Sequence, residues 1–230
     1  MKHFKQSLLG GALVLATGLA QAEVTGNIAA VSDYLFRGIS QSSNAAIQGG
    51  FDVANDSGTY AGTWLSNIDF GGGTEVDLYG GYGGETAGGL GYDAGVLYYW
   101  YPDSGGDGNE YDYAEIYVGL AMGMFSANIA YTAWGETDDA PFDTGDVYYS
   151  IGAEFPMSDL SLGLTLGYYD FNEEIQDDTE SYGHFAASLG KDVGDFGSMS
   201  VNMEFTNADE DNATINDDGP NVWIGWSKEF

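Results

Sequence analysis

The sequence predicts an all-β fold: a closed antiparallel transmembrane β-barrel of twelve strands that follows an N-terminal signal peptide. Three observations favour it, namely an export signal at the start, a series of alternating strand-like segments, and connections that are short and long in turn. The chain is strongly acidic, with 36 Asp and Glu against 5 Lys and Arg. Disorder is the usual state of such a chain, but 17 Tyr, 12 Phe and 5 Trp residues favour a folded protein.

The first residues have the form of a signal peptide. Lys2 and Lys5 precede an apolar run over residues 8–19, and Ala20-Gln21-Ala22 fits the small-x-small site of a signal peptidase. This run is too short to cross a membrane as a helix, and no later segment approaches ~20 consecutive apolar residues. With no cysteine in the chain, neither a lipoprotein nor a disulfide is expected. We therefore expect a signal peptide over 1–22 and an outer-membrane barrel over 23–230.

Twelve segments are rich in aromatic and β-branched residues and are bounded by Gly, Pro, Asn and Asp. Most have the ~9–11 residues that a tilted strand needs to cross a bilayer, and bacterial barrels have even numbers of strands. The segments are 26–38, 45–54, 59–70, 74–83, 90–101, 111–121, 124–134, 146–155, 160–171, 181–190, 197–206 and 221–230.

The connections between these segments alternate in length. Short links follow the even-numbered segments, at 55–58, 84–89, 122–123, 156–159 and 192–195. Long acidic links follow the fifth, seventh, ninth and eleventh, at 103–110, 135–145, 172–180 and 207–220. Short turns at one end and long loops at the other are typical of outer-membrane barrels, with both termini on the periplasmic side. A soluble β-sandwich, the alternative, has no reason to keep this alternation.

Within the segments, apolar and polar residues alternate, as expected when one face meets lipid and the other a lumen. In 197–206, for example, Val201 and Phe205 lie on the face opposite Ser200 and Glu204. Aromatic residues are frequent near the segment ends, and we expect some of them to form girdles at the membrane interfaces. They include Tyr34, Phe36, Tyr60, Trp64, Phe70, Tyr101, Trp134 and Tyr169.

The final segment predicts closure of the barrel. Val222, Ile224 and Trp226 share one face of a strand whose open edge would promote aggregation in a soluble protein. Pairing with the first strand removes that edge. Phe230 resembles the terminal Phe of bacterial outer-membrane barrels, which implies recognition by the barrel-assembly machinery. Lys228 departs from that pattern, and we expect it near the membrane rim, where a long side chain can snorkel.

The stretch Ser32-Asp33-Tyr34-Leu35-Phe36-Arg37-Gly38-Ile39-Ser40-Gln41-Ser42 resembles the N-terminal motif of the TorF-type porins of proteobacteria. Residues 48–52, 60–67 and 98–102 also look like that family, whereas the second half of the chain is similar only in general character. The resemblance implies a barrel in the bacterial outer membrane that acts as a porin, and it supplies no solute.

Arg37 is the notable residue of that motif. We expect it on the same face as Asp33, opposite Tyr34 and Phe36, and therefore in the lumen, because a cation facing lipid costs ~2–4 kcal/mol near the midplane. It is interpreted either as a structural ion pair or as a constriction residue that orients a solute. The expected partners are Asp33, Asp52, Glu154 and Glu204. The full set of lumen and constriction candidates is Arg37, Asp33, Asp52, Glu75, Asp77, Glu115, Glu154 and Glu204.

These carboxylates predict a porin-like channel for passive diffusion of small solutes, with a mildly cation-preferring lumen. Twelve strands lie between the filled bore of eight and the open bore of sixteen, so inward tyrosines could fill it. Those tyrosines are Tyr79, Tyr113, Tyr117 and Tyr148. The alternative is a closed structural barrel whose acidic loops, 173–180 and 209–218, bind divalent cations or partners. Divalent cations could also bridge the surface to lipopolysaccharide.

Other function classes are disfavoured. The formal net charge of −31 would repel nucleic acid. We expect no enzyme and no cofactor, since His184 is the single histidine after the signal peptide and Ser188 lies about 13 Å along the strand. A serine on a neighbouring strand, Ser161 or Ser200, stays open as a hydrolase nucleophile. No loop has the spacing of an EF-hand, so we predict no dedicated metal site.

Overall fold

The computed structural model describes residues 23–42, 44–70, 73–102, 104, 111–135, 143–172, 181–207 and 220–230. The predicted signal peptide and the two acidic loops at 173–180 and 209–218 lie outside these residues, and they stay predictions.

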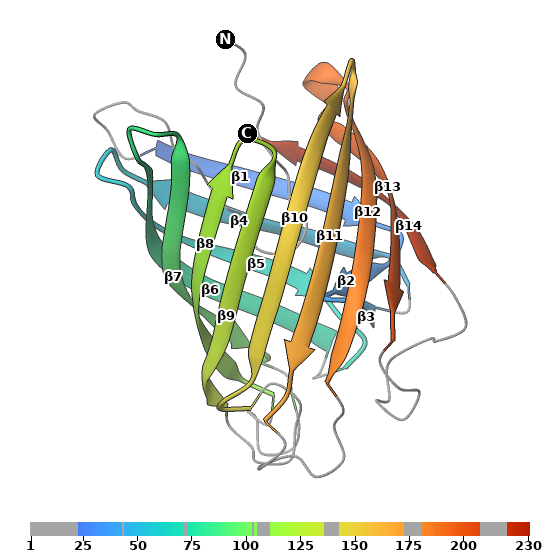
Figure 1. Ribbon diagram of the computed structural model, residues 1–230. Helices are drawn as coiled ribbons and strands as arrows, with labels where there is room; N and C mark the ends of the chain where they lie inside the picture. Colours follow the sequence, from blue (N-terminus) through green and yellow to red (C-terminus); the bar gives the residue numbers. More distant parts are fainter. Residues whose placement is uncertain are drawn as a thin grey trace.

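Twelve antiparallel strands form one closed barrel, which confirms the predicted fold class (Figure 1). Each strand pairs with the next along the chain, and β1 pairs with both β4 and β14. The strands of the barrel are β1 (Glu23–Val31), β4 (Ala46–Ala54), β5 (Thr59–Asn67), β6 (Thr74–Glu85), β7 (Leu90–Trp100), β8 (Tyr113–Met122), β9 (Phe125–Gly135), β10 (Val147–Met157), β11 (Leu160–Asp170), β12 (Tyr182–Asp192), β13 (Ser198–Thr206) and β14 (Asn221–Glu229).

Eleven of the twelve predicted segments match these strands to within three residues at each end. The first segment, 26–38, is wrong in its second half. β1 ends at Val31, and the chain leaves the barrel wall at Ser32 to form a separate hairpin of β2 (Tyr34–Phe36) and β3 (Ile39–Ser42). The wall resumes only at Ala46, so the β2–β3 hairpin is an insertion between the first two strands of the barrel.

β14 closes the barrel against β1 as the alternation predicted. Ala30 lies opposite Trp226 and Val31 opposite Gly225. The closure extends to the last residue, because the backbone N–H of Phe230 donates to Gly26 O at 2.9 Å. No strand of a closed barrel leaves a row of unpaired backbone groups. Lys228 Nζ donates to a backbone oxygen, Asp195 O, at 2.7 Å, beside the short 3₁₀ turn η2 (Gly194–Phe196) that links β12 to β13.

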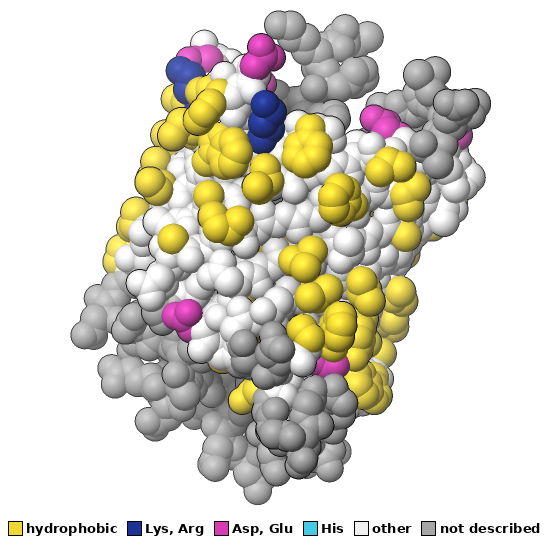
Figure 2. Space-filling model, turned by 180° about the vertical axis from the view of Figure 1, so that it is seen from behind, with side chains coloured by type: hydrophobic (Ala, Val, Ile, Leu, Met, Phe, Trp, Pro, Cys, Tyr) yellow, Lys and Arg dark blue, Asp and Glu magenta, His cyan; other side chains and the backbone are white. Residues whose placement is uncertain are grey.

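The outer wall is apolar. Figure 2 shows hydrophobic side chains spread over the wall, with charged side chains toward its two ends. In β13, Val201 and Phe205 are exposed while Asn202 and Glu204 are buried, as the alternation predicted. Asn67 is a polar residue on the outward face of β5, which it shares with Leu65. The described chain contains no helix that is long and apolar enough to cross a membrane.

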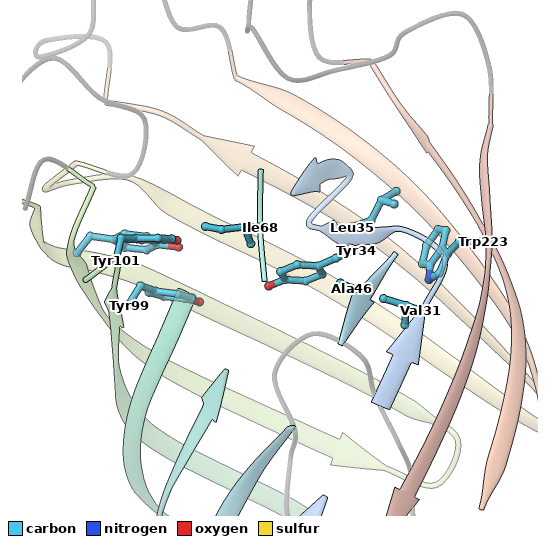
Figure 3. Packing of buried hydrophobic residues seen from close by; sticks show 9 residues of the cluster. Val31, Tyr34, Leu35, Ala46, Ile68, Tyr99, Tyr101 and Trp223 are labelled. Carbon is cyan, nitrogen blue, oxygen red and sulfur yellow. The ribbon is translucent and has the colours of Figure 1, made fainter. Parts of the chain in front are cut away.

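The β2–β3 hairpin folds into the barrel (Figure 1). Tyr34 and Leu35 are buried against residues from the wall, as Figure 3 shows. Tyr34 and Phe36 therefore point into the interior and do not belong to the interfacial girdles expected for some of the aromatic residues. The buried cluster around the hairpin consists of Val31, Tyr34, Leu35, Ala46, Ile68, Tyr99, Tyr101, Tyr113 and Trp223.

Candidate lumen site

The tip of the β2–β3 hairpin is a two-residue turn made by Arg37 and Gly38, because Phe36 and Ile39 are paired. Both turn residues have positive φ, 50° and 93°. Positive φ at both central residues is the conformation of the tight hairpin turns that fit the twist of antiparallel strands. Glycine adopts it without cost, but arginine does so only where its surroundings hold it.

Hydrogen bonds fix the base of the hairpin to the wall. Ser32 exchanges two bonds of 3.0 Å with the backbone of Ile224 in β14. Inside the hairpin, Tyr34 N donates to Ser42 Oγ at 2.9 Å, and Ser40 Oγ donates to an Asp33 carboxylate oxygen at 2.7 Å. Burial raises the pKa of Asp33, and the hydrogen bond from Ser40 opposes this rise. At the other end of the hairpin, Asp69 N donates to Gln41 O at 2.8 Å, so both ends of the hairpin are tied to the wall.

Arg37 binds Glu115 of β8 through a two-pronged ion pair. Its Nη1 and Nη2 atoms donate to the two carboxylate oxygens at 2.6 and 2.7 Å. Both side chains are largely buried, at 10% and 2% exposed. Burial works against the charge of Arg37, but the Glu115 carboxylate raises the pKa of the guanidinium well above its usual range. Arg37 is therefore charged at every accessible pH, and its planar fork matches the carboxylate.

Aromatic rings surround the same guanidinium. Its carbon lies 4.2 Å from the ring centre of Tyr148 in β10, 4.6 Å from that of Phe36 and 5.3 Å from that of Tyr169 in β11. Such cation–π contacts are worth about 2 kcal/mol when desolvated. The Tyr182 hydroxyl donates to the backbone oxygen of Arg37 at 2.9 Å. The tip of the hairpin is therefore bound by β8, β10, β11 and β12 together.

The other side of the hairpin faces β5, β6 and β7. The ring of Tyr34 packs edge-on to Trp64, with centres 5.4 Å apart, and Phe36 packs in the same way on Tyr99. The Tyr34 hydroxyl donates to Glu75 Oε1 over a long 3.4 Å. Burial and the nearby Glu75 carboxylate raise the pKa of Tyr34 well above its usual range, so the phenol stays protonated.

A second layer of tyrosines lies along the interior of β5 to β8. Tyr79 of β6 covers Gly62, the residue opposite it on β5, so closely that a methyl group at Gly62 would overlap the ring. Tyr60 covers Gly81 in the same way, and its hydroxyl donates to Asp93 at 2.8 Å. Because these rings lie over glycines, they rest flat on the wall instead of projecting across the bore.

His184 of β12 is held on both sides. Its Nδ1 atom lies 2.5 Å from Glu204 Oε1, and its Nε2 atom lies 2.9 Å from the Tyr148 hydroxyl. The ring also stacks on Tyr148 with centres 5.8 Å apart. Both ring nitrogens thus face Tyr148 and Glu204 rather than a serine. This geometry gives no support to the serine hydrolase left open by the sequence.

The structure brings together some of the predicted lumen residues and separates others. Arg37 lies in the hairpin turn and not on the first wall strand, and its carboxylate partner is Glu115. Asp33 bonds Ser40 instead, Asp52 accepts a 2.5 Å bond from Tyr79, and Glu204 faces His184. The expected pairing of Arg37 with Asp33, Asp52, Glu154 or Glu204 is therefore wrong. Glu75 and Asp77 are buried on the interior face of β6, and Glu154 is half-buried on β10.

Sequence reasoning missed the aromatic cage of Arg37. Tyr148 was expected in the lumen, but Tyr169 was named only among the aromatic residues at the strand ends, some of them expected in membrane girdles, and Tyr182 was not singled out. Tyr169 and Tyr182 alternate with outward residues of β11 and β12 and are almost fully buried. The alternation of inward and outward residues along these strands could have placed both tyrosines inside. Their contact with the tip of a distant hairpin has no local sequence signal.

The comparisons with known proteins agree with this architecture. The model of a family described as a bacterial protein of unknown function (Gcw_chp) matches residues 15–223. No curated protein matches the chain in sequence.

Among the described residues, no group of three or more His, Cys, Asp or Glu side chains is arranged to hold a metal ion.

Three solved porin structures have a similar fold. The KdgM porin superposes with a TM-score of 0.59 at 6% identity, over 90% of this chain and 99% of that chain. A structure of the KdgM porin in complex with disordered oligogalacturonate gives 0.57 at 7% identity, over 90% and 99%. The NanC porin gives 0.52 at 14% identity, over 90% and 98%. At such low identities the similarity concerns the fold.

Proposed function

The chain belongs to the Gcw_chp family of bacterial proteins, and we propose that it is a porin-type channel in the bacterial outer membrane for passive diffusion of small solutes. The observation that carries the proposal is a closed twelve-strand barrel with an apolar outer wall and a carboxylate-lined interior. A wall of this kind is stable where lipid covers it, since a soluble protein rarely exposes so much contiguous apolar surface. The fold shared with the KdgM and NanC porins supports the same conclusion.

The lumen charges favour cations and neutral solutes. Arg37 is the single guanidinium of the described interior, and it is neutralised by Glu115. Asp52 and Glu154 remain as half-buried carboxylates on the interior face. Rings of carboxylates raise the local concentration of cations and repel anions. Oligogalacturonate, with which the KdgM porin has been solved, is itself a polyanion, so we do not extend that solute to this chain.

The test is planar-bilayer conductance of the refolded barrel, with the reversal potential measured under a potassium chloride gradient. The proposal expects discrete steps and a cation-selective reversal potential. The double variant Asp52→Asn with Glu154→Gln should shift that potential toward zero. Asp170→Asn is the control for loss of a carboxylate outside the lumen, because Asp170 is exposed on the outer face of β11. An unchanged reversal potential in the double variant would show that Asp52 and Glu154 do not determine the cation selectivity.

A closed barrel is the second candidate, and the buried hairpin favours it. Leu35, Tyr99 and Tyr113 belong to one buried cluster across the interior at the end of β1. If the hairpin never moves, this cluster blocks the bore, and the role of the protein is structural or lies at its surface. Silence in the bilayer from a protein whose β-sheet spectrum shows it to be folded would favour this candidate over the channel.

We also propose that the last residue serves assembly. Phe230 is 69% exposed although its backbone bonds Gly26, so its ring is accessible at the seam between β1 and β14. Phe230→Ala should therefore lower the amount of folded protein in outer-membrane fractions. Refolding of the purified variant into detergent should stay unchanged, because the ring contributes little to the interior.

A further inference from the structure

The basic residues of the described chain are already engaged. Arg37 binds Glu115 in the interior. Lys191 Nζ lies 2.7 Å from Asp159 at the short turns, and Lys228 donates to a backbone oxygen there. The other buried carboxylates of the barrel therefore have no lysine or arginine partner within the part of the chain that the structure describes.

Most of these carboxylates are satisfied by neutral donors. Asp93 accepts from the Tyr60 hydroxyl at 2.8 Å. Asp112 accepts from the Tyr98 hydroxyl at 2.6 Å and from Tyr101 N at 2.8 Å. A carboxylate with such hydrogen bonds keeps its charge at moderate cost, so these positions do not call for an additional ligand.

Glu75 and Asp77 are different. They are successive interior residues of β6, only 2% and 8% exposed. Glu75 Oε2 and Asp77 Oδ1 are both buried and have no hydrogen-bond donor among the residues described. The other oxygen of Glu75 accepts the long bond from Tyr34. Two carboxyl groups thus lie near each other on one strand without a basic partner, and a low-dielectric interior strongly disfavours their joint ionisation unless a cation balances the charge.

A third acceptor lies in the same row of the wall. Gln48 on β4 faces Ser66 on β5, which in turn faces Glu75 on β6. Gln48 Nε2 donates to Ser66 Oγ at 3.4 Å, and this directs its amide along the row toward Glu75. Gln48 Oε1 is also buried and has no donor in the described part of the chain. Three buried oxygens therefore lack a donor: those of Gln48 and Glu75 in one row of the wall, and that of Asp77 in the next interior row of β6.

We propose that Glu75 and Asp77, with the side-chain oxygen of Gln48, bind one hard cation, and that charge balance favours calcium. Carboxylate and amide oxygens are the ligands of hard cations, and a divalent ion neutralises the two carboxylates. Two carboxylates are fewer than in a dedicated all-acid cage, so neutral oxygens and water complete the coordination. Tyr34 covers the site from the hairpin, and the cation thereby links the hairpin to β4, β5 and β6.

Calcium titration of the full mature barrel, refolded in detergent and freed of metal with EDTA, tests this site. Isothermal calorimetry should detect one site that Glu75→Gln with Asp77→Asn weakens about 100-fold, because the charge of the ligands sets calcium affinity. The matched control, Asp52→Asn with Glu154→Gln, removes the same charge from the interior and should keep the site. Weak calcium binding by exposed acidic residues is common to the wild type, the double variant and the control, so it cancels when they are compared. Sodium and magnesium titrations identify the ion.

Terbium provides an independent readout, because it replaces calcium and is excited by adjacent aromatic rings. The ring of Tyr34 should sensitise it in the wild type and not in the double variant. If the double variant fails to fold, Glu75→Gln alone gives the same comparison with about a tenfold loss. Equal calcium affinity in wild type and double variant would overturn the proposal. A wild type that binds no cation would also overturn it. A double variant that melts at a higher temperature would then show that the two carboxyls are protonated in the wild type.

Discussion

The guanidinium of Arg37 and the carboxylate of Glu115 are joined by two hydrogen bonds of 2.6 and 2.7 Å, although the residues lie 78 positions apart in the chain. One belongs to the tip of a hairpin inside the barrel and the other to the wall strand β8. This ion pair and the rings of Tyr148 and Tyr169 hold the hairpin across the bore. We therefore expect the same pair to contribute to stability and, in the proposed channel, to limit how much of the bore is open.

Breaking one side of the ion pair should destabilise the barrel by about 3–5 kcal/mol, since it leaves a buried charge without its partner. Arg37→Met and Glu115→Gln should each show such a loss in urea unfolding from lipid vesicles, followed by tryptophan fluorescence. The variant with both substitutions should lose clearly less than the sum, because no unpaired charge remains. Strictly additive losses would mean that the two side chains do not interact in the membrane.

Release of the hairpin should also change conduction. In Arg37→Ala the tip loses its ion pair and its ring contacts, so the hairpin leaves the bore more often and single-channel conductance should rise. Arg37→Lys keeps the charge without the planar fork and should give an intermediate value. A conductance equal to that of the wild type in both variants would show that the hairpin does not limit flow.

The wall of the barrel could be predicted from the sequence because a strand alternates with a period of two wherever one face is apolar. Val201 and Phe205 against Asn202 and Glu204 illustrate how the pattern assigns both faces of β13. The same rule failed beyond Val31, since a hairpin packed inside the lumen alternates just as a wall strand does. The turn at Arg37 and Gly38 was the available signal, a flexible glycine between two strand-forming runs.

The contacts of the candidate site are a different matter. The alternation of inward and outward residues in the sequence placed Arg37 and Glu115 in the lumen. Their pairing, however, depends on how far the hairpin reaches across the bore. That reach is set by the bonds of Ser32 to Ile224 and by the packing of Tyr34 on Trp64, both long-range contacts. Asp33 was the nearest acid in sequence to Arg37, yet the turn carries the two side chains apart, and Ser40 takes the bond to Asp33.

The glycines under the tyrosine layer should control the width of the bore. In Gly62→Ala the new methyl group would overlap the ring of Tyr79, which must then move toward the lumen. We expect a lower single-channel conductance and a stability loss of about 1–3 kcal/mol. Gly163→Ala is the control, because its methyl group would lie 3.9 Å from the nearest atom, Ser188 Cβ. Similar conductance in the two variants would contradict the idea that the tyrosines lie flat only over glycine.

Gly38 should stabilise the hairpin in two ways: it adopts a positive φ without strain, and it leaves room for the neighbouring His184. Its φ is 93°, and a methyl group there would lie 2.8 Å from His184 Cβ. Gly123 also has positive φ, at 64°, but has nothing within 4 Å of a methyl group. Gly123→Ala should therefore lose only the backbone term of about 1–2 kcal/mol. Gly38→Ala should lose about 1–3 kcal/mol more, because the hairpin tip must retreat from β12. Urea unfolding of both variants measures the difference, and equal losses would show that the tip is not packed against His184.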